Sequence, residues 1–255
     1  GMYKNIFTSV WDVTQIKKAA EISSKILLEL SWSAVEGSSP FEVNNLAKSL
    51  CKQNNVTSSF FGVNGPKMPF PEFCCVMVNA ETVHNIPSSK TTFQKGDVIK
   101  IDFGIIYNGF FTDHGTTVFI EPVLPIHQRL VSTVNLSVKK AVEQAYAGNT
   151  TGDIANVLGT ISTLAGFTPV TGFCGHGIGK SIHESPSIPF SGNPKTGEKL
   201  LNGMLICVEN WITAGSGRLN LQKDGWTLLT TDGSFSAMRE EMVLIENGKP
   251  VVITM

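Results

Sequence analysis

The sequence predicts an α+β fold in one domain built from two similar halves. The first observation is the order of elements, because two helical segments followed by strands occur twice along the chain. The second is that no Pro/Ser-rich linker separates the halves. The third is that alternating strand–helix units with glycine-rich phosphate loops are absent, which disfavours a nucleotide-binding doubly wound fold. We therefore expect a single domain over residues 1–255, with both halves contributing polar residues to a shared centre.

Each half begins with two helical segments. Thr14 is the expected N-cap of the first helix, whose apolar residues recur at helical spacing from residue 16 to residue 30. Ser39-Pro40-Phe41-Glu42 combines a capping box with proline at the first helical position, and predicts a helix to about Gln53. In the second half we expect a long helix from about Pro125 to Tyr146 and a shorter one from about Thr151 to Gly166.

Strands follow each helical pair. In the first half we expect a strand near Phe73–Asn79 and a hairpin that starts at Val98. The second half is rich in glycine, and its strands are expected at Thr168–Thr171, Met204–Asn210, Trp226–Thr231 and Ser236–Ile245.

The hairpin brings two carboxylates together. Asn108-Gly109 between two apolar runs predicts a two-residue turn, because both central residues need a positive φ. Pairing partners then sum to 217, so Gly104 faces Asp113 and Gly115 faces Asp102. The two aspartates share one face, on a diagonal with Cα atoms about 7–8 Å apart. The glycines opposite them are expected to leave room between the carboxylates. A solvated polar face is the alternative, which the flanking β-branched and aromatic residues disfavour.

Composition limits the class of protein. The chain is 42% hydrophobic and 16% charged, as in a well-buried globular protein. The net charge of −1 leaves no electrostatic footprint for DNA or an anionic membrane, so we expect neither as a partner. The five cysteines are an odd number and lack the spacing of a structural zinc site. Together with the absence of a secretory signal pattern, they predict a cytoplasmic protein.

The second half supplies further groups that can bind metal. His176 lies among three glycines, which favours a site more than a packed core, with a turn histidine in a flexible loop as the alternative. Glu209 ends an apolar strand, where burying its carboxylate unpaired would cost roughly several kcal/mol. A cation or strong donor is therefore expected beside it. Of Glu240 and Glu241, one should point inward.

These residues resemble the methionine aminopeptidases of the pita-bread metallopeptidase family, over nearly the whole chain. The matching motifs are Lys100-Ile101-Asp102 with Asp113 eleven residues later, Gly175-His176-Gly177-Ile178-Gly179, His183-Glu184-Ser185-Pro186, Val208-Glu209, Lys223-Asp224-Gly225-Trp226-Thr227, and Ser236-Ala237 leading to Glu240. The short interval between His183 and Glu209 leaves no room for the helical insertion of the type 2 enzymes, so the chain resembles type 1. The resemblance implies a pita-bread fold, with a curved antiparallel sheet covered by helices in two pseudo-symmetric halves.

The resemblance also implies a centre of two divalent metal ions, with ligands Asp102, Asp113, His176, Glu209 and Glu240. Asp102 would bind one metal, Asp113 and Glu240 would bridge, and His176 and Glu209 would complete the second. Oxygen ligands with one imidazole suit Mn²⁺, Fe²⁺, Co²⁺ or Zn²⁺, and the sequence does not choose among them.

Catalytic and substrate-binding positions carry over from the family in the same way. His84 and His183 match the histidines beside the scissile bond, and Glu209 would handle the proton. Cys75, Ile182 and Trp226 match positions that line the substrate pocket together with the two histidines. His114 and His127 match no catalytic position, so His114 is expected beside the site at most and His127 at the surface.

The sequence departs from the family pattern around the pocket. The usual tyrosines are missing, and a longer segment carries Phe60-Phe61 through Phe70-Pro71-Glu72-Phe73. These phenylalanines either rebuild an apolar pocket for a thioether or pack into the core. Asn210 replaces a usual proline and Glu241 a usual histidine.

The activity implied by the resemblance is release of N-terminal methionine from peptides and nascent chains by a monomeric enzyme. A contact with the ribosome is left open. A related Xaa-Pro aminopeptidase is the first alternative, because Arg239–Leu244 also resembles that branch. A non-catalytic binding protein of the same fold is the second, and the five retained ligand positions disfavour it.

Overall fold

The computed structural model describes residues 2–254 and contains the two predicted sets of helices and strands. The helices are α1 (Val10–Ser33), α2 (Pro40–Gln53), α3 (Pro125–Ala141), which a short 3₁₀ turn continues to Gln144, and α4 (Thr151–Leu164). The strands of the first half are β1 (Thr57–Ser58), β2 (Cys74–Val78), β3 (Glu81–Thr82), β4 (Val98–Phe103), β5 (Ile105–Tyr107), β6 (Phe110–Phe111) and β7 (His114–Phe119). Those of the second half are β8 (Thr168–Pro169), β9 (Gly175–Gly177), β10 (Glu184–Ile188), β11 (Leu205–Thr213), β12 (Leu219–Leu221), β13 (Leu228–Thr230), β14 (Ser236–Glu246) and β15 (Lys249–Val252).

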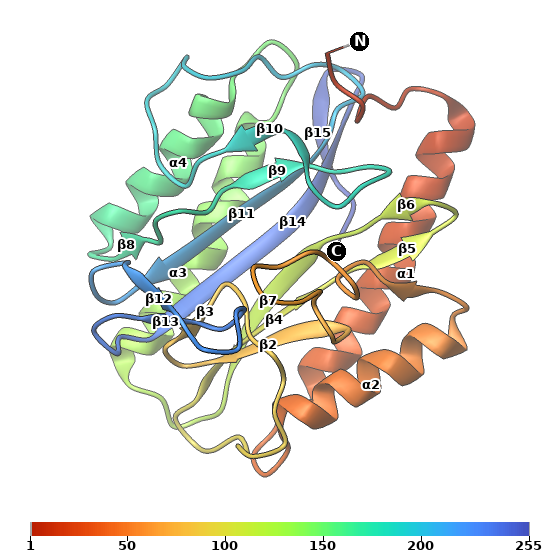
Figure 1. Cartoon of the computed structure of the whole chain (residues 1–255). Coiled ribbons are helices and arrows are strands. Elements are labelled where there is room, and N and C mark those ends of the chain that lie inside the picture. Colours follow the sequence, from red (N-terminus) through yellow and green to blue (C-terminus); the bar gives the residue numbers. More distant parts are fainter. Residues whose placement is uncertain (1, 255) are drawn as a thin grey trace.

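A nine-stranded antiparallel sheet joins the two halves. Its path runs β10-β9-β11-β14-β7-β4-β2, with β15 added to β14 and β8 to β11. In Figure 1 the helices α3 and α4 lie behind the strands of the second half, and α1 and α2 lie beside those of the first. The curved sheet covered by helices in two halves confirms the predicted α+β fold. The single domain over residues 1–255 stays a prediction, which the sheet shared by both halves supports.

The helix starts follow local capping chemistry. Helix α1 begins at Val10 because the Ser9 hydroxyl accepts a hydrogen bond from the Asp12 amide at 3.1 Å. The Thr14 hydroxyl instead donates to the Val10 carbonyl at 2.7 Å within the helix, so the prediction of Thr14 as N-cap was wrong. The capping signal lies seven residues, about two turns, before the apolar periodicity starts at Ile16. Helix α2 begins as predicted, with the Ser39 hydroxyl accepting from the Glu42 amide at 3.2 Å.

The hairpin has the predicted register. Tyr107 pairs with Phe110 across the turn, and Asp102 pairs with Gly115 further along. The two glycines do not themselves leave open space, because other groups fill the positions of their missing side chains, and room between the carboxylates stays a prediction. A Cβ atom on Gly104 would lie 1.9 Å from the carbonyl oxygen of Thr112, and one on Gly115 would lie 2.5 Å from the terminal methyl group of Met238. Glycine here permits close backbone approach and admits a side chain from β14.

One alternative and one expectation differ from the structure. The His176 segment forms strand β9, which pairs with β10 and β11 on either side, so the alternative of a turn histidine in a flexible loop was wrong. Glycine gives little β-propensity, so local sequence carried no signal for this strand. His127 is not at the surface but buried, and its ring stacks on that of Phe235 with centroids 4.1 Å apart.

Two global properties bear on where the protein works. Across residues 2–254, none of the helices combines the length and apolar character needed to cross a membrane. All five cysteines carry free thiols.

Candidate metal centre

A row of directly paired residues crosses five strands of the main sheet. From β2 to β11 the row consists of Cys75, Asp102, Gly115, Glu240 and Glu209. Directly paired residues point to the same face of a sheet. Three of the predicted metal ligands therefore share one face, although 138 sequence positions separate Asp102 from Glu240.

The other two predicted ligands reach the same face from the next row. Asp113 precedes Gly115 by two positions, and His176 pairs with Cys207, which precedes Glu209 by two. Since side chains repeat every two residues along a strand, both groups point toward the carboxylates. The first half of the chain thus contributes two of the five groups and the second half three.

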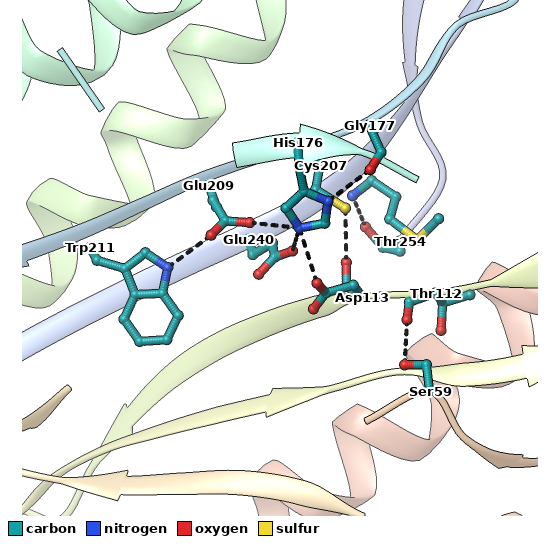
Figure 2. A network of polar contacts seen from close by, with 11 residues as sticks. Ser59, Thr112, Asp113, His176, Gly177, Cys207, Glu209, Trp211, Glu240 and Thr254 are labelled. Carbon is teal, nitrogen blue, oxygen red and sulfur yellow. Dashed lines mark hydrogen bonds and ion pairs between the residues drawn. The ribbon is translucent and has the colours of Figure 1, made fainter. Parts of the chain in front are cut away.

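Three of the carboxylates surround His176, as Figure 2 shows. Its Nε2 atom lies 3.2 Å from Oδ2 of Asp113, 3.7 Å from Oε2 of Glu209 and 3.9 Å from Oε2 of Glu240. Its Nδ1 atom lies 2.8 Å from the Gly177 carbonyl oxygen, which can accept only from a protonated nitrogen. That contact fixes the tautomer in which Nε2 offers a lone pair to a metal.

The donor set fits divalent cations. Each of the four carboxylates is buried and has one oxygen that finds no hydrogen-bond partner among residues 2–254: Oδ1 of Asp102, Oδ1 of Asp113, Oε2 of Glu209 and Oε2 of Glu240. Buried polar atoms are normally paired, because leaving one unpaired is costly. Oxygen-rich sites with one imidazole bind divalent cations, which would give each of these oxygens a partner.

The acid–base state of the cluster also points to a need for positive charge. Burial, followed by the charges of neighbouring carboxylates, raises the pKa of Asp102 and of Glu240 well above the usual values. Burial also raises the pKa of Glu209 to about 7. Without cations, these groups are accommodated only by binding protons.

His176 and Asp113 behave as an ion pair within this cluster. Burial opposes a charge on His176, but the Asp113 hydrogen bond and the Glu209 charge outweigh it and raise the pKa of His176 to about 9. Burial likewise favours neutral Asp113, yet the bond from His176 lowers its pKa below the ordinary value.

Cys207 is a neighbour that sequence reasoning missed. A ligand atom of Cys207 lies within 4.8 Å of those of Asp113, His176 and Glu240. Its thiol donates to the Asp113 carbonyl oxygen, with the sulfur 3.5 Å away, and burial raises its pKa well above the usual value. The side chain therefore remains a neutral thiol beside the carboxylates. Only its position two residues before Glu209 could have indicated this.

A cavity of about 620 Å³ opens beside the cluster. The residues that line it include all ten predicted site positions: Cys75, His84, Asp102, Asp113, His176, Ile182, His183, Glu209, Trp226 and Glu240. The ring centroids of His183 and His176 lie 4.5 Å apart. The His84 ring lies 5.5 Å from that of Trp226 and 5.7 Å from that of Phe173.

Phenylalanines of the long segment form part of the cavity wall. Phe60 and Phe70 are buried and line it, whereas Phe61 is 56% exposed and packs on Phe73. The Phe70 and Trp226 rings meet edge to face at 5.1 Å, and the Trp226 indole N–H donates to the Met68 carbonyl oxygen at 3.1 Å. The alternatives for this segment were an apolar pocket and packing into the core. Its inner phenylalanines, Phe60 and Phe70, contribute to the cavity.

Asn210 and Glu241, which depart from the family pattern and follow ligands in the sequence, point away from the cluster. The Asn210 amide donates at 2.9 Å to the hydroxyls of Ser137 on α3 and Ser162 on α4. Glu241 accepts from the Arg239 Nε–H at 2.8 Å. Both neighbours of the ligands are thus held on the helix-covered side of the sheet.

Comparison with known proteins agrees with this geometry. A model of metallopeptidase family M24 matches residues 14–247. The methionine aminopeptidase of Clostridium perfringens is 32% identical over 244 residues, which is 96% of each chain. The crystal structure of methionine aminopeptidase from Rickettsia prowazekii has a TM-score of 0.94 and 27% identity, with both chains fully covered. The prolidase from Pyrococcus horikoshii matches with a TM-score of 0.78 at 21% identity and over 64% of its length, which shows the fold alone.

A site of buried carboxylates around one histidine, in this fold, defines a metallopeptidase. The chain therefore belongs to metallopeptidase family M24 and, within it, to the methionine aminopeptidases. The predicted family and enzyme class are confirmed. Family membership and the buried donor set together support the use of divalent metal.

Proposed function

We propose that this chain hydrolyses the first peptide bond of peptides and nascent chains and releases N-terminal methionine. The observation that carries the proposal is the combination of two features in one cavity. Four buried carboxylates with unpartnered oxygens lie beside a wall of aromatic and apolar side chains. The first feature suits metal-assisted hydrolysis and the second suits a flexible thioether side chain.

The metal site would hold two divalent ions, and four carboxylate charges would balance them. Asp102 would bind one ion, Asp113 and Glu240 would bridge, and His176 and Glu209 would complete the second. Bound there, the ions would polarise the scissile carbonyl and lower the pKa of an attacking water. Mn²⁺, Fe²⁺, Co²⁺ and Zn²⁺ all suit this donor set.

Glu209 is the group we propose for handling the proton. Its Oε1 atom accepts from the Trp211 indole N–H at 3.1 Å, while Oε2 faces the cluster without a hydrogen-bond partner. Oε1 is thus held in place, and we propose that Oε2, which faces the ions, also passes the proton between the attacking water and the leaving amine.

His84 and His183 would act on the substrate as neutral hydrogen-bond donors. Burial, reinforced by the charge of His183, lowers the pKa of His84 to about 4. Burial and the charge of His176 lower the pKa of His183 as well. A neutral imidazole still donates one N–H, which can bind the scissile carbonyl or amide as charge develops.

Substrate selection would occur at the aromatic end of the cavity. Cys75 and Ile182 supply small and branched apolar surface, and Phe60, Phe70 and Trp226 supply rings. An apolar pocket of this kind accepts methionine and excludes charged first residues by their desolvation cost.

We further propose a monomer in the cytoplasm. The five free thiols suit a reducing compartment. A peptide or nascent-chain N-terminus is the proposed partner, and the net charge of −1 agrees with the expectation that neither DNA nor a membrane surface binds. A ribosome contact stays an open prediction.

The deciding experiment compares two substrates with each divalent metal. Met-Gly-Met should be cleaved and an Ala-Pro substrate should not. Cleavage of the proline substrate alone would overturn the assignment in favour of an Xaa-Pro aminopeptidase. A protein that binds none of the metals and cleaves neither peptide would be the non-catalytic alternative.

A further inference from the structure

Lys100 is a fully buried lysine that the proposed mechanism does not use. It lies on β4, two residues before Asp102, and its exposed fraction is 0%. The pleat therefore directs it to the same face as the metal ligands, one row away. No carboxylate lies within 4 Å of its ammonium group among residues 2–254.

The ammonium group binds backbone instead. Its Nζ atom donates to the carbonyl oxygen of Asn79 at 2.7 Å. Asn79 lies in the turn between β2 and β3 and has a φ of 57°, a left-handed conformation that needs local support. A buried methionine would fill a similar volume without the desolvation cost of an ammonium group. The hydrogen bond to this turn, together with the charges of Glu81 and Asp97 nearby, is what distinguishes lysine here.

Other contacts fasten the same turn to the sheet. The Ser236 amide donates to the Asn79 carbonyl oxygen at 3.1 Å, and the Ser236 and Thr82 hydroxyls lie 2.7 Å apart. The Asn79 side chain accepts from the Val98 amide at 2.9 Å. The turn is thus held at its start by Lys100, by β4 and by the Ser236 amide of β14, and at its end by the Ser236 hydroxyl.

This turn leads directly to His84. Val83 has a φ of 69°, and the His84 amide donates to the Thr82 carbonyl oxygen at 2.9 Å. The His84 ring then lies between those of Phe173 and Trp226 at the cavity wall. Because the chain between Asn79 and His84 is short and tightly bonded, a shift of the turn moves the imidazole.

We propose that Lys100 is a positioning residue, whose hydrogen bond to the Asn79 carbonyl sets the place of His84 in the cavity. The proposal rests on the function proposed above. Lys100 touches neither substrate nor metal, and acts through the backbone of residues 79–84. A displacement of about 1 Å at a reacting group can lower a rate on the order of 10²-fold, so a modest shift has a measurable effect.

The first test replaces Lys100 by methionine in the metal-loaded protein. The kcat for Met-Gly-Met should fall about 10- to 100-fold, with KM and metal content close to wild type. Lys52→Met, at the exposed end of α2, is the matched control and should keep wild-type kcat. Wild-type kcat in Lys100→Met would overturn the proposal.

A double-mutant cycle tests the route through His84. If Lys100 acts through that ring, adding Lys100→Met to His84→Ala should lower kcat by less than about twofold, because coupled residues are not additive. Full additivity would show that Lys100 supports the fold at large, and would overturn the positioning role.

Two further measurements keep the proposal testable if Lys100→Met misfolds or if the wild-type protein is inactive. Ethylammonium added to Lys100→Ala should restore kcat, and tetramethylammonium, which has no N–H donor, should not. Equal effects of the two ions would contradict the proposal. In spectra of ¹⁵N-histidine protein, Lys100→Met should move the His84 signals, identified with His84→Ala, and leave in place those of His114, whose ring is bonded to Ser23. Unmoved His84 signals would refute positioning even if the wild type cleaves neither peptide, so the two proposals fail separately.

Discussion

Glu209 and Glu240 lie directly opposite each other on neighbouring strands at the centre of the main sheet. Like charges in such a pair are destabilising, more so when buried. The nearest positive group is His176, whose Nε2 atom is 3.7 Å from one carboxylate and 3.9 Å from the other. One imidazolium cannot balance four carboxylates, so the site needs either bound protons or further cations, and the predictions below test which of them it uses.

Removing a proposed bridging ligand should abolish the centre. Glu240→Ala or Asp113→Ala takes away a carboxylate that would contact both ions, so bound metal should fall below two per chain and turnover of Met-Gly-Met should be lost. Elemental analysis and a coupled peptide assay measure both. Glu246→Gln, further along the same strand and partly exposed, is the control and should behave as wild type. Wild-type turnover in either alanine variant would refute the dinuclear site.

His84→Ala should slow catalysis without loss of metal. The ring lies at the cavity wall, and loss of a positioned imidazole typically lowers kcat on the order of 10²–10⁴-fold. Steady-state kinetics beside metal analysis separates the two effects. If the variant instead loses its metal, His84 has a different role from the one assigned.

Without metal, the protein should lose stability as the pH rises. The pKa of Glu209 is about 7 in the fold against an ordinary 4.5, so the folded state holds a proton that the unfolded state has released. That stabilisation is complete below pH 4.5 and is lost as the pH rises through about 7. His176, with its pKa raised to about 9, acts in the same direction at higher pH.

Thermal melts of chelated and metal-loaded protein from mildly acidic to alkaline pH measure this effect. The chelated protein should melt at progressively lower temperature, whereas the loaded protein should change little because cations replace the protons. Parallel curves for the two forms would show that the carboxylates do not carry the proposed charge.

Phe70 should contribute to substrate selection. It is 2% exposed, lines the cavity and packs against Trp226. Phe70→Ala enlarges the pocket, and we expect kcat/KM for Met-Gly-Met to fall about 10- to 200-fold, the range for lost pocket contacts. Phe61→Ala, in an exposed neighbour outside the cavity, should leave kcat/KM unchanged. Equal effects of the two substitutions would indicate a general loss of packing instead.

The sequence predicts the centre best where local rules fix geometry. Asn108-Gly109 sets the turn, and the two-residue repeat then determines which face Asp102 and Asp113 share. The Ser39-Pro40 start of α2 was predicted for the same reason, since cap and proline act within one turn. The prediction of Thr14 as N-cap failed because apolar periodicity marks the buried face of a helix and not its first residue.

Features that depend on residues far apart in the sequence could not be predicted. Nothing near His176 indicates a strand, because β9 exists through its pairing with β10 and β11. The space beside Gly115 is filled by Met238, which is 123 residues away in sequence. The choice between pocket and core for Phe60 and Phe70 depended on the position of Trp226, which long-range packing determines.

Strand β14 has a consequence for the timing of assembly. It spans residues 236–246, near the end of the chain, yet on the sheet path it alone connects β11 to β7. A chain that stops before residue 236 holds two separate half-sheets, with Asp102 and Asp113 on one side and His176 and Glu209 on the other. During synthesis from the N-terminus, the ligands therefore meet only after residues 236–246 have left the ribosome. An enzyme proposed to trim newborn chains cannot assemble its own metal centre before β14 is made.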